Sequence, residues 1–222
     1  MIHIIGDSHV SVFSGTDYMQ PTWPNIKDGP HDGIRANLLP GITQYRLGPI
    51  TAYNFEAKAD GWVQDLILST EDKTEQLAAL SKTKEAIELA NSTVVDKEND
   101  WIFFNLGEID CSAHLPKQSE LTSIDRAVET CVRKYVTYLA RIKSQGYNVG
   151  VIGPHIAQWH LENTVIKEIT EKFNRMLKMS GFRFVTAYDF CAANPSSDNY
   201  IDGYHLSSNV LPNVLKQIED GK

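Results

Sequence analysis

The sequence predicts an α/β protein in which a central parallel sheet of about five strands lies between two layers of helices, a three-layer α/β/α sandwich. Three observations predict this fold class. Short apolar runs alternate with longer segments of helical periodicity along the chain. Most of these runs end at a glycine, as strands do when they open into a turn. A chain of 222 residues, 42% of them hydrophobic, can bury one substantial core, so residues 1–222 are expected to form a single domain.

The first predicted strand covers the β-branched run at 2–5 and ends at Gly6. Asp7, Ser8 and His9 follow in the turn. Ligands bind outside the carboxyl ends of the strands in open α/β sheets, so a serine flanked by an acid and an imidazole is placed for chemistry there. A purely structural interpretation is that Asp7 or Ser8 caps the next helix, because both residue types accept hydrogen bonds from the free N–H groups of a first turn.

The segment between the first strand and the central strand is less regular. Proline and glycine interrupt residues 11–40, which predicts a long ordered loop that forms a wall of the site. A second strand is predicted at 44–47 and ends at Gly48, whose backbone N–H would face the same crevice. One or two helical turns are predicted at 61–69, and a clearer amphipathic helix at 73–90.

The strongest strand signal is the aromatic and aliphatic run at 101–106. A run that is apolar at nearly every position belongs in the middle of a sheet that is covered on both faces. It ends at Gly107, and Glu108 and Asp110 follow at its carboxyl end. Two carboxylates are therefore expected at the ligand-binding edge of the sheet.

Helices and strands continue to alternate in the second half of the chain. Apolar residues recur at helical spacing after Ser123, and Gly146 ends that helix. Asp202 and His205 lie in a polar loop before the last helix. The predicted elements are helices at 123–144, 162–179 and 214–218 and strands at 148–152 and 182–188.

Composition limits the kinds of partner. The net charge is −7, and no run of Lys or Arg forms a stripe, so the chain is not expected to bind nucleic acid or a membrane. A small-molecule or glycan substrate is expected instead. The three cysteines are odd in number and widely spaced, which indicates reduced thiols. The chain opens directly on a strand, without a basic and apolar leader, which favours a cytoplasmic protein.

Four blocks of the sequence, taken together and in order, resemble those of the SGNH or GDSL-type hydrolases, whose fold is flavodoxin-like. They are Gly6-Asp7-Ser8, Gly48, Gly107-Glu108-Ile109-Asp110 and Asp202-Gly203-Tyr204-His205. The resemblance spans nearly the whole chain, and each block lies at a predicted strand end or in the last loop. It implies an esterase or acyltransferase that needs no cofactor and no metal.

The resemblance implies a role for each matching residue. Ser8 is the expected nucleophile, His205 the base that takes its proton, and Asp202 the acid that orients the imidazole. The backbone N–H groups of Ser8 and Gly48 are expected to form the oxyanion hole of the tetrahedral intermediate. A serine hydroxyl is a poor nucleophile until a base removes its proton, so the three side chains must converge.

One position departs from the family. The third block usually carries an asparagine before its aspartate, and the amide of that asparagine is the third oxyanion donor, but this chain has Ile109 there. Isoleucine donates nothing, and an ionised Glu108 is an acceptor that would repel an oxyanion. Three residues near strand ends can replace the donor by their position, and the sequence leaves the choice among them open: His9, Asn105 and His155.

Two alternatives use the same residues. Asp7 and His9 form an Asp-x-His after the first strand, which looks like the opening of the dimetal phosphoesterases. The chain lacks the Gly-Asp and Gly-Asn-His blocks that this class carries after later strands. The further metal donors of this first alternative are Glu108, Asp110, His114, His155 and His205.

The second alternative is a catalytically degenerate member that binds a glycan or acyl ligand, and the missing asparagine favours it. The expected function is a serine-dependent enzyme that acts on an acyl ester of a carbohydrate or another small alcohol.

Overall fold

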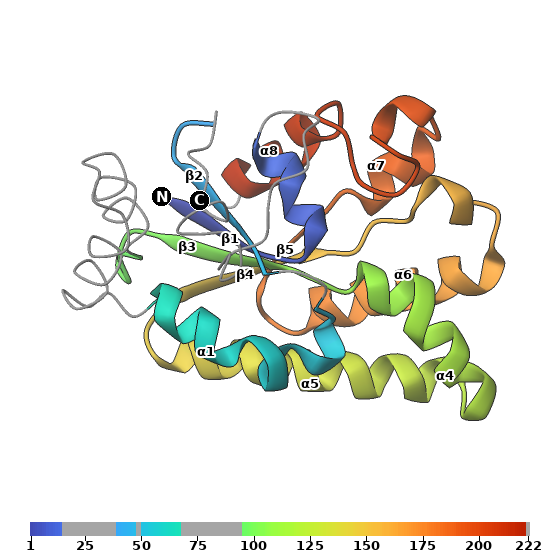
Figure 1. Ribbon diagram of the computed structural model, residues 1–222, viewed down its shortest axis with the longest axis horizontal. Helices are drawn as coiled ribbons and strands as arrows, with labels where there is room; N and C mark the ends of the chain where they lie inside the picture. Colours follow the sequence, from blue (N-terminus) through green and yellow to red (C-terminus); the bar gives the residue numbers. More distant parts are fainter. Residues whose placement is uncertain (15–38, 48–49, 68–94, 221–222) are drawn as a thin grey trace, which may run out of the picture.

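The computed structural model describes residues 1–14, 39–47, 50–67 and 95–220. Five parallel strands form one sheet in the order β2-β1-β3-β4-β5 (Figure 1). The predicted α/β class is confirmed, and so is the interior position of the run at 101–106. The strands are β1 (Ile2–Gly6), β2 (Ile42–Arg46), β3 (Trp101–Asn105), β4 (Asn148–Gly153) and β5 (Arg183–Thr186).

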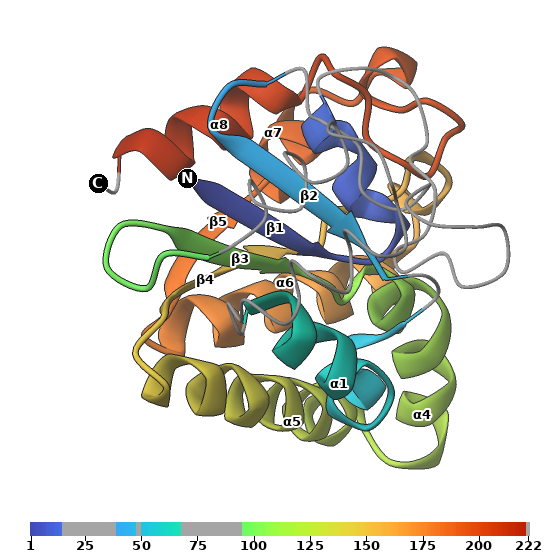
Figure 2. The same ribbon diagram turned by 60° about the vertical axis from the view of Figure 1, so that its left-hand side comes forward.

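Helices cover both faces of the sheet, as Figures 1 and 2 show. One face carries α1 (Phe55–Ile67), α4 (Leu115–Leu121), α5 (Ile124–Ser144) and α6 (Thr164–Met179). The other face carries the 3₁₀ helix η1 (Ser8–Ser14) together with α7 (Tyr188–Ala193) and α8 (Leu211–Asp220). The helices that the structure describes include none long and apolar enough to cross a membrane.

The two helical layers explain why β3 is apolar from Trp101 to Phe104. Ile102 and Phe104 belong to the core cluster on the α5 side, where the Phe104 ring meets Tyr138 edge to face. Phe103 points the opposite way and packs in the cluster that includes the apolar face of α8. Successive side chains of a strand alternate between faces, so a strand that is buried on both sides has no polar positions.

The amphipathic helix α5 begins and ends where the sequence predicts. Ser123 is its N-cap, and the serine side chain accepts a hydrogen bond from the backbone N–H of Arg126. Gly146, which follows the helix, has a φ of 93°. Its buried stripe comprises Ala127, Val128, Cys131, Val132, Tyr135, Tyr138, Leu139 and Ile142.

Two glycines allow the chain to turn at the carboxyl ends of the central strands. A Cβ on Gly6 would overlap the backbone oxygen of Asn105 in the neighbouring strand β3. Gly107 has a φ of 114°, and a Cβ there would press against the ring of Phe173. Because both positions exclude a larger residue, the chain leaves β1 and β3 closely side by side, and the residues that follow the two strands become neighbours.

Several element boundaries differ from the sequence prediction. The second strand begins earlier, at Ile42, and the helix predicted at 61–69 is the longer α1. The last strand is shorter, because the Thr186 side chain accepts a hydrogen bond from the N–H of Tyr188 and the chain turns into α7. The helix predicted at 73–90 lies outside the described residues, as does most of the loop predicted at 11–40, whose first residues belong to η1.

Candidate active site

Ser8, His205 and Asp202 form one row of hydrogen bonds at the carboxyl edge of the sheet. Ser8 follows β1 as the first residue of η1, whereas the other two lie in the loop before α8. The His205 Nε2 atom is 2.8 Å from Ser8 Oγ, and His205 Nδ1 is 2.8 Å from Asp202 Oδ2. A carboxylate can only accept, so Nδ1 carries a proton and Nε2 is free to accept the serine O–H.

The electrostatics of this row suit a neutral imidazole beside an ionised acid. Burial and the nearby charge of His9 lower the pKa of His205, although Asp202 acts in the opposite direction. Partial burial opposes the charge on Asp202, but hydrogen bonds from the backbone and ring of His205 and from the backbone of Tyr204 outweigh it and lower the pKa to about 2. Near neutral pH the pair is therefore a carboxylate and a neutral histidine that can accept a proton.

The loop at 202–205 is held by its own first residue. Asp202 Oδ1 accepts the backbone N–H groups of Tyr204, at 2.9 Å, and of His205, at 2.8 Å. Gly203 between them has a φ of 82°, which a side chain would strain. The carboxylate that is bonded to the imidazole thus also holds the turn that carries this ring, and the spacing of three residues between Asp202 and His205 fits this local geometry.

A second histidine and carboxylate pair lies next to the row. His9 Nε2 is 3.1 Å from Glu108 Oε2, and both residues are buried. The His9 ring centroid lies 4.7 Å from that of His205 and 4.8 Å from that of His155. Within the described part of the chain, His9 Nδ1 is buried and has no hydrogen-bond partner.

Charges around His9 favour its protonated form. Burial opposes a charge on this imidazole, but Asp7 and Glu108 outweigh it and raise the pKa. Burial likewise opposes ionisation of Glu108, and the hydrogen bond and charge of His9 outweigh it and lower the pKa of this carboxyl. Both pKa shifts therefore favour an ion pair between these two buried side chains, and a protonated imidazole carries a proton on each ring nitrogen.

His155 is placed differently from His9. Its Nε2 donates to the carbonyl oxygen of Tyr204, at 2.9 Å. Burial and the charge of His9 lower the pKa of His155 to about 4, so the ring is neutral at physiological pH. The single N–H of a neutral imidazole is thus already used, and the other ring nitrogen can only accept.

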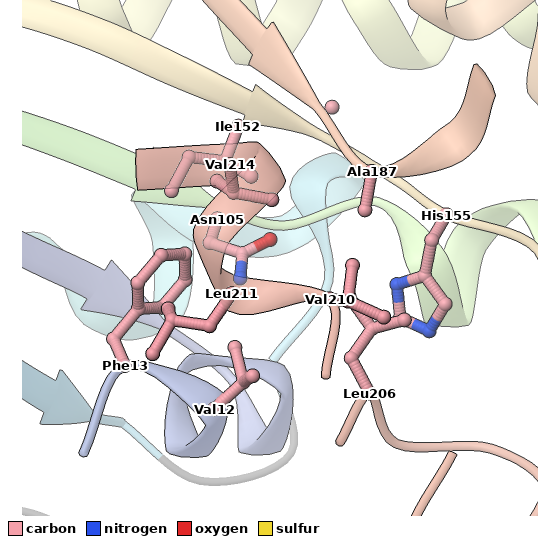
Figure 3. A pocket seen from close by; sticks show the side chains of 11 residues that line it. Val12, Phe13, Asn105, Ile152, His155, Ala187, Leu206, Val210, Leu211 and Val214 are labelled. Atoms are coloured by element: carbon pink, nitrogen blue, oxygen red, sulfur yellow. The ribbon is translucent and has the colours of Figure 1, made fainter. Parts of the chain in front are cut away.

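Asn105 points into a small cavity of about 10 Å³ between η1, β4 and α8 (Figure 3). Its walls are mostly apolar, and the polar groups on them come from Asn105 and His155. This volume is about the space of one water molecule, too little for a substrate. The lining residues are Val12, Phe13, Asn105, Ile152, Gly153, His155, Ala187, Leu206, Val210, Leu211 and Val214.

Asp110 does not join these residues, contrary to the sequence expectation. Its Oδ2 accepts the N–H of Ala52 at 2.6 Å, its Oδ1 faces the N–H of Tyr53 at 3.4 Å, and the Cys131 thiol lies 3.6 Å away. Both carboxylate oxygens are thus engaged with the segment that follows β2. Asp110 anchors that segment, which explains a buried carboxylate in this position.

Several donors of the metal alternative are engaged in other contacts. Asp110 is bound to backbone, and His155 to the Tyr204 carbonyl. Among the residues with a described placement, no group of three or more His, Cys, Asp or Glu side chains is arranged to hold a metal ion. Gly48, the second expected backbone donor of the oxyanion hole, lies outside the described residues.

Two residues near the row were missed by the sequence prediction. Tyr204 lies inside the fourth block, and its hydroxyl is 2.6 Å from Ser112 Oγ. Trp159, in the short helix η4 (Gln158–His160), packs against the loop at 202–205 with most of its side chain exposed. The sequence carries no periodic signal for Trp159, because it lies in an irregular stretch after β4.

Comparison with solved structures finds proteins of the same fold as this chain. No protein-family model and no curated protein sequence matches the chain. A member of the lipolytic G-D-S-L family from Veillonella parvula is 11% identical, with a TM-score of 0.50 over 99% of this chain and 96% of its own.

The second similar structure is a catalytic mutant of Axe2, an acetylxylan esterase from Geobacillus stearothermophilus. It is 12% identical, with a TM-score of 0.52 over 99% of this chain and 92% of its own. Another mutant of Axe2, described as an acetyl-xylooligosaccharide esterase, has a TM-score of 0.53 at 12% identity, with the same coverage. The chain therefore has the fold of the SGNH or GDSL-type hydrolases.

Proposed function

We propose that the protein is a serine-dependent ester hydrolase or acyltransferase, with Ser8 as nucleophile, His205 as general base and Asp202 as orienting acid. The observation that carries the proposal is the unbroken row of two 2.8 Å hydrogen bonds from Ser8 Oγ through the imidazole to Asp202. The three residues come from opposite ends of the chain, 197 positions apart for Ser8 and His205. A structural cap for η1 needs no such partners, whereas an activated hydroxyl needs all three.

The first half of the reaction follows from this geometry. Ser8 Oγ attacks the carbonyl carbon of the ester while its proton passes to His205 Nε2, and Asp202 stabilises the imidazolium that forms. The tetrahedral intermediate collapses when the imidazolium returns this proton to the leaving alcohol. Water or a second alcohol then attacks the acyl-serine, with His205 again as base, and the choice between them decides hydrolysis or transfer.

Backbone N–H groups of Ser8 and Gly48 are the proposed donors of the oxyanion hole, on the resemblance of these blocks to the family. For the third donor we propose His9. The N–H of His155 is already bound to a carbonyl, and Asn105 points into the small cavity beneath η1. His9, in contrast, immediately follows the nucleophile and has a buried Nδ1 without a partner among the described residues.

The hydrogen bond between His9 and Glu108 also explains how a carboxylate can lie near a site where negative charge develops on the substrate. An isolated carboxylate near the site would oppose negative charge that develops on the substrate. Bound to His9 at 3.1 Å, it instead acts with Asp7 to raise the pKa of the imidazole, which favours the protonated form that presents an N–H donor. A charged donor forms a stronger hydrogen bond than a neutral amide, which compensates for the isoleucine at position 109.

The proposed substrate is an acyl ester of a carbohydrate or another small alcohol. Support comes from the solved structures of similar fold, whose descriptions name acetylxylan and acetylated xylo-oligosaccharides as substrates of Axe2. The net charge of −7 also fits a neutral substrate better than an anionic one.

Turnover of 4-nitrophenyl acetate by the protein and by two serine variants tests the proposal. Ser8→Ala is expected to lower kcat by at least about a thousandfold, because the nucleophile is gone. Ser144→Ala is the matched control, since this exposed hydroxyl donates to the carbonyl of Arg141 in its own helix. Equal activity of Ser8→Ala and the parent would contradict the proposal. A chelator that abolishes turnover, with recovery on adding manganese or zinc, would contradict it as well.

A further inference from the structure

Trp159 is the most exposed large aromatic side chain among the described residues, with 69% of its surface accessible. Tryptophan buries a large area when it is covered, and it is enriched at binding interfaces. The other exposed large aromatic side chain among the described residues is Tyr53, and the Lys134 ammonium lies 3.7 Å from its ring centroid. Within the described ranges, no cation lies over the Trp159 ring.

The indole is fixed against the loop that carries the acid and the base. The backbone N–H of Gln158 donates to the carbonyl of Gly203, at 2.9 Å. A Cβ on Gly203 would collide with the Trp159 indole nitrogen, so the absence of a side chain allows the ring to pack there. The Tyr204 ring lies 6.2 Å from the indole at an angle of 44°. These contacts immobilise one side of the indole and leave much of the rest to solvent.

Because Trp159 packs against the loop at 202–205, its indole lies near the residues of the proposed reaction. Gly203, against which the indole packs, lies between Asp202 and His205, and the His205 imidazole is bonded to Ser8. A group that rests on the indole therefore lies beside the loop that carries Asp202 and His205. A flat, rigid and uncharged surface in this position can hold the alcohol part of a substrate but cannot take part in proton transfer.

We propose that Trp159 is the platform of a carbohydrate subsite, on which the sugar ring that carries the acyl group stacks. The apolar C–H face of a pyranose matches the face of an indole, and its hydroxyl groups remain in water. Aromatic stacking also costs little conformational entropy, because the Trp159 ring is held before the ligand arrives. The inference rests on the proposed function, because the sugar ring is oriented so that its acyl group faces Ser8 as the nucleophile.

Kinetics with two substrates measures the effect on catalysis. Trp159→Ala is expected to raise KM for an acetylated xylo-oligosaccharide roughly tenfold or more, since loss of a stacked ring has an effect of this order. Turnover of 4-nitrophenyl acetate, which has no sugar, is expected to change less than twofold. Trp159→Phe keeps an aromatic face and should recover most of the loss. Met179→Ala removes an exposed apolar side chain of α6 and is the matched control, with both substrates unchanged.

A binding measurement separates this inference from the proposed function. Calorimetric titration of xylo-oligosaccharide into Ser8→Ala needs no turnover, and binding should weaken roughly tenfold when Trp159→Ala is added. If the parent turns over no ester but this binding loss is seen, the subsite stands and the catalytic proposal fails. If esters are cleaved but Trp159→Ala alters both substrates equally, or neither, the subsite is wrong. Absence of oligosaccharide binding by Ser8→Ala would overturn it too.

Discussion

His9 Nε2 lies 3.1 Å from Glu108 Oε2 in a buried ion pair beside the imidazole of His205. The two residues are 99 positions apart and follow the neighbouring strands β1 and β3. A buried ion pair contributes little to net stability compared with apolar residues of the same volume, so its presence here needs a functional reason. Supply of a charged N–H to the oxyanion is the reason we propose, and it leads to several predictions.

Glu108→Gln keeps the size of the side chain and removes its charge. Asp7 still raises the pKa of His9 in this variant, but the hydrogen bond and charge of Glu108 are lost, so the protonated form with a proton on Nδ1 is less favoured. We expect kcat for 4-nitrophenyl acetate to fall on the order of a hundredfold, with a smaller change in KM. Glu171→Gln is the control, because the hydrogen-bond partner of Glu171 among the described residues is the Tyr188 hydroxyl, and this variant should be within twofold of the parent. An unchanged kcat in Glu108→Gln would count against a charged His9.

Ile109→Asn restores the amide that the family carries. If His9 already supplies the third donor, the new amide should raise kcat less than about threefold, whereas loss of His9 should cost roughly a hundred- to a thousandfold. The double variant His9→Ala with Glu108→Ala is the better deletion, because it does not leave Glu108 buried without its partner. Asn105→Ala and His155→Ala should each have a smaller effect. A large gain from Ile109→Asn, together with an active double variant, would show that nothing replaces the family donor.

The pH dependence of kcat/KM reports the titration of the base in the free enzyme. Because burial and His9 lower the pKa of His205, the acid limb of the profile should have its midpoint below 6.5. Asp202, with a pKa of about 2, should add no further limb above pH 3. Replacement of this acid by Asn should move the midpoint lower still, since its hydrogen bond and charge raise the pKa of His205. A midpoint above 7 in the parent would contradict this assignment.

Asp7→Asn should change how stability depends on pH. Burial raises the pKa of Asp7 to about 6, above its ordinary value of 3.8, and Oδ2 has no partner in the described part of the chain. The folded protein therefore holds the proton more tightly, so ionisation destabilises it progressively from pH 4 to above pH 6. The shift corresponds to about 3 kcal/mol.

Urea unfolding of the two proteins at pH 4 and at pH 7.5 measures this effect. The variant should gain stability relative to the parent between the two pH values, by an amount of the order of that shift. The His9 N–H that Asp7 Oδ1 accepts, at 2.9 Å, can be kept by the asparagine carbonyl, so local structure is preserved. A difference between the proteins that is the same at both pH values would show that Asp7 is not the titrating group.

The parts of the fold that the sequence predicts are those with a strong local signal. The run at 101–106 is apolar throughout because helices cover both faces of β3, and α5 is marked by the Ser123 cap and a regular apolar stripe. The short elements at 110–121 and the helix α7 carry no comparable period. Their conformation depends on contacts from elsewhere, such as the Asp110 carboxylate that binds the segment after β2.

In the candidate site too, some residues have a local sequence signal and others depend on contacts between distant segments. Ser8, Asp202 and His205 are predicted from blocks of sequence, since a turn after a strand and a spacing of three residues are local features. The ion pair between His9 and Glu108 depends on the parallel register that places Gly6 opposite Asn105, and this register is not encoded in either segment alone. The sequence shows that His9 follows one strand and that Glu108 follows another. It does not show that these two strands are neighbours, so the contact between the two side chains cannot be predicted from it.

Labelling with a fluorophosphonate probe tests directly whether the Ser8 hydroxyl is activated by His205. The probe should form a covalent adduct that mass spectrometry maps to the peptide containing Ser8. Labelling should be absent in Ser8→Ala, slowed at least about a hundredfold in His205→Ala, and unchanged in the control Ser144→Ala. An adduct that persists in Ser8→Ala, or a parent that stays unlabelled while it is folded, would contradict a serine nucleophile at this site.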